Sequence, residues 1–598
     1  MSSSELSSTP ASNTAPTSHT SSSNGIDFPE YKPKDQPIEN FRPLKVIAIG
    51  AGFSGIYLGV RVPEWLRNVD LVVYEKNDGL GGVWWENRYP GCACDIPAHS
   101  YVYTFEENPG WSKFYAPSGE IQKYLQTVAD KYSVGRFVKL NHKVVGCTWD
   151  ATSSKWKVDV EKTATGEVFS DEADVVISAR GGLNDYLWPQ IDGLWSFRGK
   201  LLHSANWDTS FDYSNKRIGV IGGGSSAIQI VPQLQKVAGT QLSCFIRSKT
   251  WISSTFGESA MQKLGLDHED FTQEDFDKYM SDPEKYHAFR KIIETEGNAM
   301  HSFSLKGSPV SEYAREAFTQ LMRSRLIKKP ELMESLIPSF APGCRRLTPG
   351  PGFLEALTED NVEFIKTPIQ AVTENGVILK GGRLVELDVL VCATGFNATG
   401  APSFPVVGIN GKTLSARWDP YPEAYMSVAV DGFPNFFTML GPNSGVASGS
   451  LTKILESSGD YIIKCIRKLQ KEDIRSMRIS ARATSSWVRF VEVYFQKTVF
   501  LDNCHTWYRK NNRICGIWPG STLHALEALR SPRWEDFEYD YGENSDHDRL
   551  LRWLGNGWSE LQLADGDISF YIEPDYIDKP TAPFPEKTEK WNHRSFSH

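Results

Sequence analysis

The stretch LKVIAIGAGFSGIYLGVRV, residues 44–62, decides the fold, because an apolar run enters a glycine-rich turn and leaves as a second apolar run. A strand, a tight turn and a helix N-terminus in this order aim backbone N–H groups and a helix dipole at a pyrophosphate. The turn contains Gly50, Gly52, Phe53, Ser54 and Gly55. A further apolar run, LVVYE, ends at Glu75, where a carboxylate can bind a ribose 2′-hydroxyl. The sequence therefore predicts an α/β domain that binds a dinucleotide.

A second copy of this pattern is KRIGVIGGGSSAIQIV, residues 216–231, with Ala227 in place of the third glycine. Its candidate nucleotide-binding residues are Gly222, Gly224, Ser225, Ser226 and, after the next strand, Ser248. Arg247 lies 25 residues after the first glycine of this turn, the offset at which the first copy has Glu75. An arginine pairs with a ribose 2′-phosphate that a carboxylate would repel, so the second site favours NADPH. The alternative is that Arg247 is only a solvated strand end.

The length, charge and composition of the chain exclude several classes of protein. A chain of 598 residues is long enough for about three or four domains. Its net charge of −9 argues against nucleic acid or an anionic membrane surface as the main partner. The first 30 residues are mostly Ser, Thr, Asn, Pro and Ala, which predicts a disordered tail and not a signal peptide. No stretch reaches the roughly 18 apolar residues of a membrane span, so we expect a soluble, cytoplasmic protein.

The cysteines give no indication of a disulfide framework. There are nine, an odd number scattered over a long chain. Cys92 and Cys94 form a CxC pair, which is too short for a CxxC redox pair, and we interpret them as small core or loop residues. No metal site is expected.

A third pattern lies between the two glycine-rich turns. FRGKLLHSANWD, residues 197–208, fits FxGxxxHxxxW[P/D] at Phe197, Gly199, His203, Trp207 and Asp208. With these motifs the chain resembles the flavoprotein monooxygenases that have two dinucleotide-binding domains, and most closely the type I Baeyer–Villiger monooxygenases, over roughly residues 41–525. The resemblance implies FAD in the first site and NADPH in the second. It also implies that an oxygen atom from O2 is inserted beside a ketone carbonyl, giving an ester or lactone.

The fingerprint residues are expected to act at a hinge. In the family the histidine belongs to the linker between the two domains, so His203 is expected to couple NADPH binding to domain movement. Direct proton transfer by His203 is the alternative. Related N- and S-oxygenating enzymes have Tyr or Phe at the position of Trp207, which favours the Baeyer–Villiger branch.

The resemblance also implies the catalytic residues. GGVWWENRYPGCACD, residues 81–95, is similar to the segment after the FAD ribose acid, and Asp95 stands where the family has an active-site aspartate. The implied flavin contacts are Gly82, Val83, Trp84, Asp95 and Tyr101. APGCRRLTPGPGF, residues 341–353, is similar to the segment with a basic pair, which makes Arg346 the catalytic arginine and Arg345 a contact of the NADPH 2′-phosphate. The family more often has lysine at the position of Arg345.

An arginine beside a carboxylate suits this chemistry. A fixed guanidinium, always charged, stabilises the negative charge that develops on oxygen. Asp95 would orient the guanidinium of Arg346 and compensate its charge.

Two later segments are open to two interpretations each. HTWYRKNNRICGIWPGS, residues 505–521, is similar to a family segment in which Trp507 packs near the nicotinamide, but Trp507 could equally be a core aromatic residue. GPNSGVASGS, residues 441–450, is a flexible loop on the flavin side of the pocket or a plain linker.

The predicted fold is α/β, with two Rossmann-like dinucleotide-binding domains, the second inserted in the first. LDVLVCATGFNA, residues 387–398, is predicted to return the chain to the first domain. The predicted parts are a disordered Ser/Thr-rich tail (1–40), an FAD-binding domain in two parts (41–180 and 387–525), an NADP-binding domain in two parts (181–254 and 341–386), a helical insertion (255–340) and a C-terminal extension (526–598).

Three other functions are alternatives to this one, and the first of them stays open. One is an N- or S-oxygenating or hydroxylating flavin monooxygenase on the same scaffold. A disulfide reductase would need a CxxC or CxxxxC, which the chain lacks, and a redox-inactive regulator would lack the Asp95–Arg346 pair. The 31 Phe and 18 Trp favour a bulky, apolar or aromatic ketone of secondary metabolism as substrate.

Overall fold

The chain divides into two units. The smaller unit contains the described residues 34–38, 550–564 and 566–573, and the larger unit spans residues 39–545. This computed structural model describes residues 34–266, 268–398, 400–542, 550–564 and 566–573. Residues 1–33 of the predicted tail lie outside the described residues. In the smaller unit the amide of Ile38 donates to the carbonyl of Trp558 at 3.0 Å, and the short helix α15 (Glu560–Leu563) follows.

The first sheet of the larger unit is parallel and is covered on both faces. Its strand order is β17-β7-β1-β2-β3. The strands are β1 (Leu44–Ile49), β2 (Val69–Tyr74), β3 (Val138–Lys139), β7 (Val175–Ser178) and β17 (Phe436–Thr438). Val46 and Ala48 of β1 pack against helices, whereas Ile47 and Ile49 pack against a second, smaller sheet. Since both faces are buried, the strand has to be apolar at almost every position.

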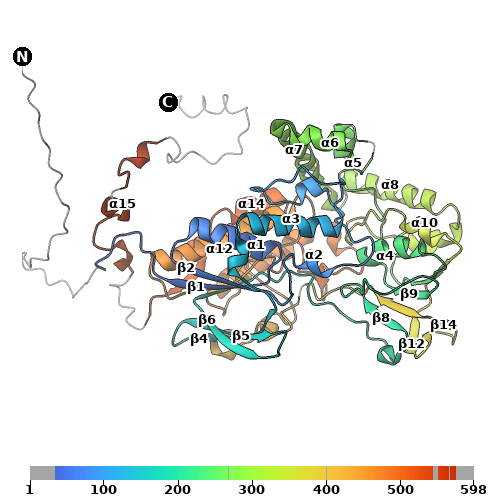
Figure 1. Cartoon of the computed structure of the whole chain (residues 1–598), viewed down its shortest axis with the longest axis horizontal. Helices are drawn as coiled ribbons and strands as arrows, with labels where there is room; N and C mark the ends of the chain where they lie inside the picture. Colours follow the sequence, from blue (N-terminus) through green and yellow to red (C-terminus); the bar gives the residue numbers. More distant parts are fainter. Residues whose placement is uncertain (1–33, 267, 399, 543–549, 565, 574–598) are drawn as a thin grey trace, which may run out of the picture. The chain divides into compact units, whose positions relative to one another are not determined.

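The two layers on this sheet can be followed in Figure 1. The helices are α1 (Phe53–Trp65), α3 (Ser118–Lys131) and α12 (Leu451–Lys471). The opposite layer is a sheet of β16 (Val406–Val407), β4 (His142–Asp150), β5 (Lys155–Lys162) and β6 (Val168–Ala173). Helices α1 and α12 approach closely at Gly459, where a Cβ atom would lie 2.4 Å from Cε1 of Tyr57.

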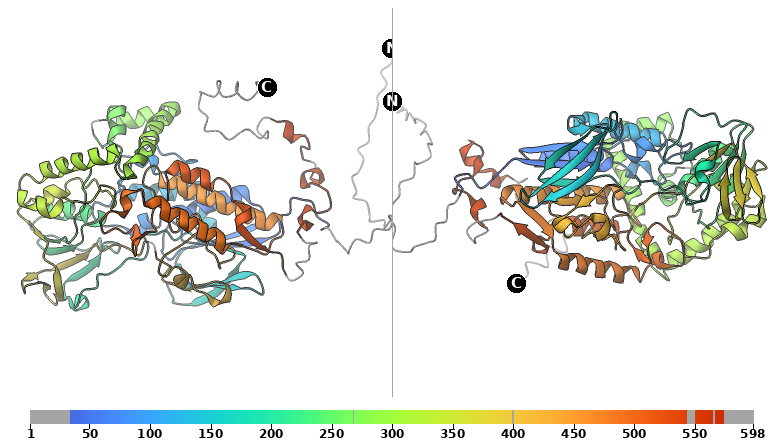
Figure 2. Two further views of the ribbon diagram at one scale, coloured as in Figure 1. Left: turned by 180° about the vertical axis from the view of Figure 1, so that it is seen from behind. Right: turned by 90° about the horizontal axis from the view of Figure 1, so that it is seen from below.

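The second sheet repeats this architecture in a separate lobe (Figures 1 and 2). Its order is β11-β10-β9-β15-β8, and all its pairs are parallel. The strands are β8 (Lys200–His203), β9 (Arg217–Ile221), β10 (Gln241–Phe245), β11 (Val362–Ile365) and β15 (Val389–Cys392). One face is covered by α4 (Ser225–Gln235) and α10 (Phe353–Leu357), and the other by β12 (Ile369–Thr373), β13 (Gly376–Leu379) and β14 (Leu384–Glu386).

The predicted α/β fold is confirmed, because both large sheets are parallel and are packed against helices. The predicted insertion of the second domain in the first is also seen, because every strand of the second sheet falls between β7 and β17 in the chain. One predicted strand is assigned to the wrong sheet. Val389–Cys392 was expected in the first domain, but it lies between β9 and β8 in the second sheet. The strand that returns to the first sheet is β17. An apolar run that is buried on both faces fits either parallel sheet, so the local pattern cannot decide between them.

Residues 255–340 form mainly helices. These are α5 (Glu258–Leu264), α6 (Gln273–Met280), α7 (Pro283–Ala299), α8 (Pro309–Arg325) and α9 (Met333–Leu336). Helix α6 begins where it does because Thr272 accepts from the amide of Asp275 and the Asp275 carboxylate accepts from the amide of Thr272. Pro283 occupies the first turn of α7, where its missing N–H costs nothing. None of the helices in the described ranges is long and apolar enough to span a membrane.

The remaining elements support the first sheet and the region around Trp507. They are α2 (Val83–Glu86), α11 (Leu414–Arg417), α13 (Ala481–Phe495), α14 (Thr522–Leu529), β18 (Ser476–Ile479), β19 (Arg509–Lys510), β20 (Arg513–Ile514) and β21 (Phe537–Asp540).

Candidate active site

The first glycine-rich turn leaves a helix N-terminus free of side-chain caps. Helix α1 starts at Phe53, and its N-cap residue, Gly52, makes no side-chain hydrogen bond. A Cβ atom on Gly55 would lie 2.0 Å from the carbonyl oxygen of Gly50, so the turn excludes any side chain at that position. Gly82, the residue before α2, has φ +55° and approaches Gly52 so closely that its Cβ would lie 2.9 Å from the Gly52 Cα. The uncapped amides and the bare backbone can therefore accommodate a phosphate group.

Glu75 fixes this turn to the end of β2. Its carboxylate is 4% exposed and accepts from the amide of Ala51 at 2.8 Å and from the amide of Asn77 at 2.9 Å. Burial raises the pKa of Glu75, while the two amide bonds oppose that rise. Each carboxylate oxygen retains a lone pair with which it can accept from a hydroxyl group.

The second turn has a similar free helix N-terminus and an arginine beside it. Helix α4 begins at Ser225 after Gly224, which provides no side-chain cap. Arg345 donates to the carbonyl of Gly223 at 3.2 Å and to the carbonyl of Lys249 at 3.3 Å. Burial lowers the pKa of Arg345, and no carboxylate among the described residues pairs with it. A half-buried cation of this kind suits an anionic group at the helix N-terminus.

Arg247 is on the loop after β10, and its side chain is exposed to solvent. Within the described ranges it forms no side-chain hydrogen bond or ion pair. Ser248, the next residue, is half-buried. Both residues remain candidates for contact with a ribose 2′-phosphate.

Asp95 and Arg346 form a bidentate ion pair although they lie 251 residues apart. Nη2 of Arg346 donates to Oδ1 of Asp95 at 2.5 Å, and Nε donates to Oδ2 at 3.3 Å. The Asp95 carboxylate raises the pKa of Arg346 above its usual value. The Arg346 side chain is 36% exposed and that of Asp95 is 16% exposed. The guanidinium is thus held by one edge and remains partly accessible.

Aromatic side chains surround this pair. Tyr508, which belongs to no predicted motif position, is 5% exposed. Burial raises the pKa of Tyr508, and the adjacent Arg346 guanidinium opposes the rise. Trp84 donates through Nε1 to the hydroxyl of Tyr101 at 3.2 Å, and Tyr101 packs edge-on against Phe53. Tyr101 thus links the first glycine-rich turn to the segment that carries Asp95.

Trp507 is 42% exposed, so it is not the core aromatic residue of the alternative interpretation. The buried ring of this segment is its neighbour Tyr508, whose centroid lies 4.6 Å from that of Trp507. The only signal in the sequence that could have pointed to Tyr508 is its place next to Trp507.

A disulfide between Cys344 and Cys504, which lie 160 positions apart, ties the segment of Arg346 to the segment that precedes Trp507 and Tyr508. No local pattern indicates this disulfide, because its cysteines are so far apart in the chain. Arg509 donates to the carbonyls of Phe500 at 2.9 Å and Asp502 at 2.7 Å and so holds the loop around Cys504. The other seven cysteines, with Cys92 and Cys94 among them, are free and buried, as expected of small core residues.

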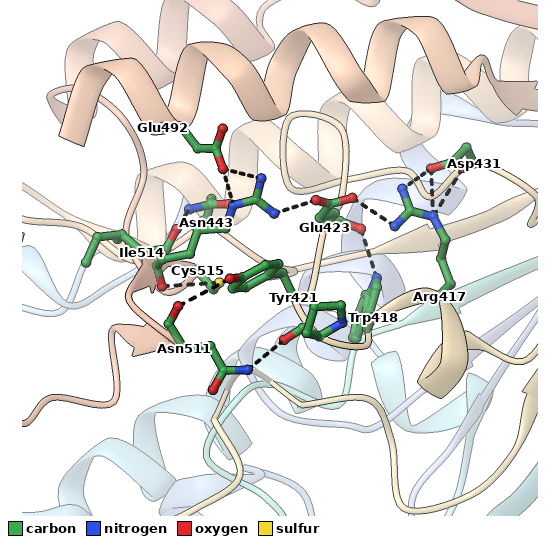
Figure 3. A network of polar contacts seen from close by, with 12 residues as sticks. Arg417, Trp418, Tyr421, Glu423, Asp431, Asn443, Glu492, Asn511, Ile514 and Cys515 are labelled. Atoms are coloured by element: carbon green, nitrogen blue, oxygen red, sulfur yellow. Dashed lines mark hydrogen bonds and ion pairs between the residues drawn. The ribbon is translucent and has the colours of Figure 1, made fainter. Parts of the chain in front are cut away.

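A chain of ion pairs anchors the β19–β20 hairpin that follows Trp507 and Tyr508 (Figure 3). Arg513 of β20 donates to Glu423 at 2.6 Å and also pairs with Glu492 of α13. The other oxygen of Glu423 accepts from Arg417 at 2.9 Å, and Arg417 pairs in turn with Asp431 at 2.6 Å. The side chain of Glu423 is 21% exposed and sits between two guanidinium groups, so it is the central member of this network.

We expect Glu423→Ala to destabilise the hairpin by about 1–3 kcal/mol, because two charge-assisted hydrogen bonds are lost while both arginines keep one partner. Thermal unfolding of the flavin-bound protein should begin at a lower temperature. Glu492→Ala is the matched control, because Glu492 is 46% exposed at the end of the network. A Glu423→Ala midpoint no lower than that of Glu492→Ala would contradict a central role.

The fingerprint segment lies on an edge strand and packs against both connections between the two sheets. His203, the last residue of β8, is 1% exposed; its ring stacks on Tyr186 at 4.5 Å and lies 6.2 Å from the ring of Phe396. Burial lowers the pKa of His203 to about 4, so its ring is neutral near pH 7. These contacts suit a hinge residue, and proton transfer by His203 gains no support from them.

The other fingerprint residues have local roles. Phe197 is buried in the core of the second lobe, and a Cβ atom on Gly199 would lie 2.5 Å from the carbonyl oxygen of Asp388. Trp207 stacks on Tyr213 with centroids 5.2 Å apart. Asp208 accepts from Lys200 at 2.5 Å.

Residues 441–450 pack beside the hairpin and are not a plain linker. The side-chain amide of Asn443 donates to the carbonyls of Ile514 and Ile517, both at 3.0 Å. The amide of Gly445 donates to the carbonyl of Gly516 at 2.8 Å. These three hydrogen bonds therefore attach this loop to the segment after Trp507.

Comparisons with known proteins agree with this arrangement. Residues 44–267 match the family described as flavin-binding monooxygenase-like. The FAD-binding monooxygenase tazF of Aspergillus terreus is 38% identical over 540 residues, which cover 89% of this chain and 95% of the relative. A Baeyer–Villiger monooxygenase of Pseudomonas aeruginosa is 31% identical, over 80% of this chain and 88% of the relative.

Solved structures share the fold. A cyclohexanone monooxygenase from Rhodococcus sp. Phi1 bound to NADP+ superposes with a TM-score of 0.72 at 25% identity, over 84% of this chain and 100% of the other. An oxidized steroid monooxygenase bound to NADP gives a TM-score of 0.69 at 25% identity with the same coverage.

Proposed function

The chain belongs to the flavin-binding monooxygenase-like family and is a flavin-dependent monooxygenase, and we propose that it carries out a Baeyer–Villiger reaction. In this reaction an oxygen atom from O2 is inserted beside the carbonyl of a ketone, giving an ester or lactone. The observation that carries the proposal is the bidentate Asp95–Arg346 pair beside Tyr508.

The residues present fit both cofactors. For FAD, the first turn offers the uncapped N-terminus of α1, bare backbone at Gly52 and Gly82, and the buried Glu75 carboxylate for a ribose hydroxyl. For NADPH, the second turn offers the N-terminus of α4 and the half-buried Arg345, which has no carboxylate partner among the described residues. An unpaired cation at that position is the feature that favours a phosphorylated ribose.

When bound, FAD supplies the chemistry that activates O2, with electrons from NADPH. Arg346 stabilises the negative charge that develops on oxygen during insertion, because its guanidinium stays charged and partly accessible. Asp95 holds the guanidinium in one orientation and offsets its charge. Tyr508 is buried next to Arg346, on a segment that the Cys344–Cys504 disulfide tethers.

The remaining predicted contacts complete the two cofactor sites. We assign Phe53, Ser54, Val83, Trp84 and Tyr101 to the flavin nucleotide, and Ser225, Ser226, Arg247, Ser248 and Trp507 to the nicotinamide nucleotide. For the substrate we infer a bulky, apolar or aromatic ketone of secondary metabolism, in keeping with the 31 Phe and 18 Trp of the chain.

A panel of cyclic, linear and polycyclic ketones tests the reaction. We expect FAD-loaded protein supplied with NADPH and O2 to convert at least one bulky ketone into a product heavier by one oxygen that hydrolyses as an ester. Amines and sulfides with the same carbon skeletons form the control set. Oxygenation of the control set alone would replace the Baeyer–Villiger assignment with N- or S-oxygenation on the same scaffold.

A further inference from the structure

The segment that leads to Asp95 packs directly on α4, the helix that starts at the second glycine-rich turn. The hydroxyl of Tyr89 donates to Oε1 of Gln229 at 2.9 Å. Nε2 of the same side chain donates to the carbonyl of Ala93 at 3.0 Å. The half-buried side-chain amide of Gln229 therefore bonds residues 89 and 93 through its oxygen and its nitrogen. Ala93 lies two positions before Asp95.

The backbones meet at a point that admits no side chain. Gly91 has φ +78°, and a Cβ atom there would lie 2.7 Å from the carbonyl oxygen of Gln229 and 2.9 Å from Cγ of Gln233. Contact this close means that residues 89–93 have to follow any shift of α4. The Gln229 side chain sets the register of that contact.

Tyr89 also reaches the first turn of α4. Its ring packs against the core of the second lobe. Burial raises the pKa of the Tyr89 hydroxyl, and a hydrogen bond with Ser226 opposes the rise. Ser226 lies at the uncapped N-terminus, where the phosphates of a nucleotide would bind. The hydroxyl of Tyr89 thus donates to Gln229 and lies close to the proposed phosphate site.

The other member of the catalytic pair is attached to the same turn. Arg345, next to Arg346, donates to the carbonyls of Gly223 and Lys249. Asp95 is connected to α4 through Ala93, and Arg346 is connected to the preceding turn through Arg345. Both residues of the Asp95–Arg346 ion pair are therefore connected to the second glycine-rich turn and α4, where NADP would bind.

We propose that Tyr89, Ala93 and Gln229 form a clasp through which a nucleotide at the second turn sets the geometry of the Asp95–Arg346 pair. Gln229 and Tyr89 are positioning residues, since they act on the pair through the backbone of residues 93–95. This inference rests on the proposed assignment of NADP to the second turn. When the nucleotide is bound, it fixes the N-terminus of α4, and the clasp keeps Asp95 in its bidentate contact with Arg346. Because the ion pair is held in this way, NADPH oxidation is coupled to oxygen transfer.

Hydrogen exchange with NADP+ as the probe tests the clasp without turnover. In FAD-loaded wild-type protein, NADP+ should slow exchange at the amides of Ser225 and Ser226 and also in residues 92–95. In Gln229→Ala the slowing at α4 should remain and that in residues 92–95 should be lost. Tyr89→Phe, which removes only the hydroxyl, should give an intermediate loss and serves as the second variant should Gln229→Ala fail to retain FAD.

The matched control is Gln235→Ala. Gln235 is the last residue of α4, and its side-chain amide donates to Oδ1 of Asn361 at 3.2 Å, so its partner lies outside residues 89–93. This variant should respond as the wild type does. If residues 92–95 respond to NADP+ equally in wild type and in both clasp variants, or never respond while α4 does, the clasp is refuted.

A turnover measurement separates this proposal from the proposed function. With a ketone that the wild type oxygenates, Gln229→Ala should raise the fraction of NADPH oxidation that appears as hydrogen peroxide by about fivefold or more. This size is expected because the variant loses two neutral hydrogen bonds, and a fivefold change corresponds to about 1 kcal/mol, the contribution of one such bond. The rate of flavin reduction should change much less. Wild-type protein that makes no ester refutes the proposed function alone, since the exchange result still reports on the clasp. Ester formation with unchanged coupling in Gln229→Ala refutes the clasp alone.

Discussion

Arg346→Ala should abolish oxygen insertion while NADPH still reduces the bound flavin. The loss should be at least about 10²- to 10³-fold, the usual cost of removing one pre-organised donor, because here a full positive charge is removed. Arg346→Lys should restore only part of the activity, since an ammonium lacks the planar fork that Asp95 grips through two nitrogens. Asp95→Ala should act in the same direction but less strongly. Anaerobic stopped-flow reduction and product mass measure the two steps separately.

Arg325→Ala is the matched control for this result. Arg325 of α8 also forms a bidentate pair, donating to Glu355 of α10 at 2.7 and 2.9 Å. The control should oxygenate ketones at close to the wild-type rate. An Arg346→Ala enzyme that makes ester as fast as this control would remove Arg346 from the mechanism.

The double variant Arg247→Ala/Arg345→Ala should lose its preference for NADPH over NADH. Each charge-assisted hydrogen bond to a phosphate contributes about 1.5–3 kcal/mol, so each arginine accounts for roughly 10- to 150-fold in NADPH affinity. Arg345 should contribute more, because it is half-buried and has no carboxylate to compete for it among the described residues. The KM values for both nucleotides, measured by flavin reduction, give the preference directly.

NADH is the internal control, since it lacks the 2′-phosphate. The second control is Arg383→Ala, an exposed arginine of the same lobe that pairs with Glu363. Equal losses for NADPH and NADH in Arg345→Ala would mean that Arg345 only supports the backbone at Gly223 and Lys249.

The features that could be predicted from the sequence are those formed by residues close together in the chain. The two glycine-rich turns are recognisable because a strand, a turn without side chains and a helix start follow one another within a few residues. Asp95 and Arg346 lie 251 residues apart, and only the family resemblance suggested that they act together. The Cys344–Cys504 disulfide and the clasp at Gln229 have no local pattern at all.

The misassigned strand has a different cause. The residues of β15 are fully buried, so their apolar pattern is that of any central parallel strand. Which sheet receives the strand depends on its pairing with β8 and β9, whose partner residues lie 189 and 171 positions earlier in the chain. Trp507 and Tyr508 show the same limit on a smaller scale, because neighbouring aromatic residues of similar size differ only in which one the tertiary fold buries.

The disulfide has a topological consequence for the candidate active site. The main chain between Cys344 and Cys504 passes from the second sheet back to the first, so the crosslink closes a covalent ring around that passage. Arg346 is therefore joined by two covalent routes to Cys504, which lies four positions before Tyr508. Hydrolysis of one peptide bond in the stretch between Arg346 and Cys504 would still leave both residues in a single molecule.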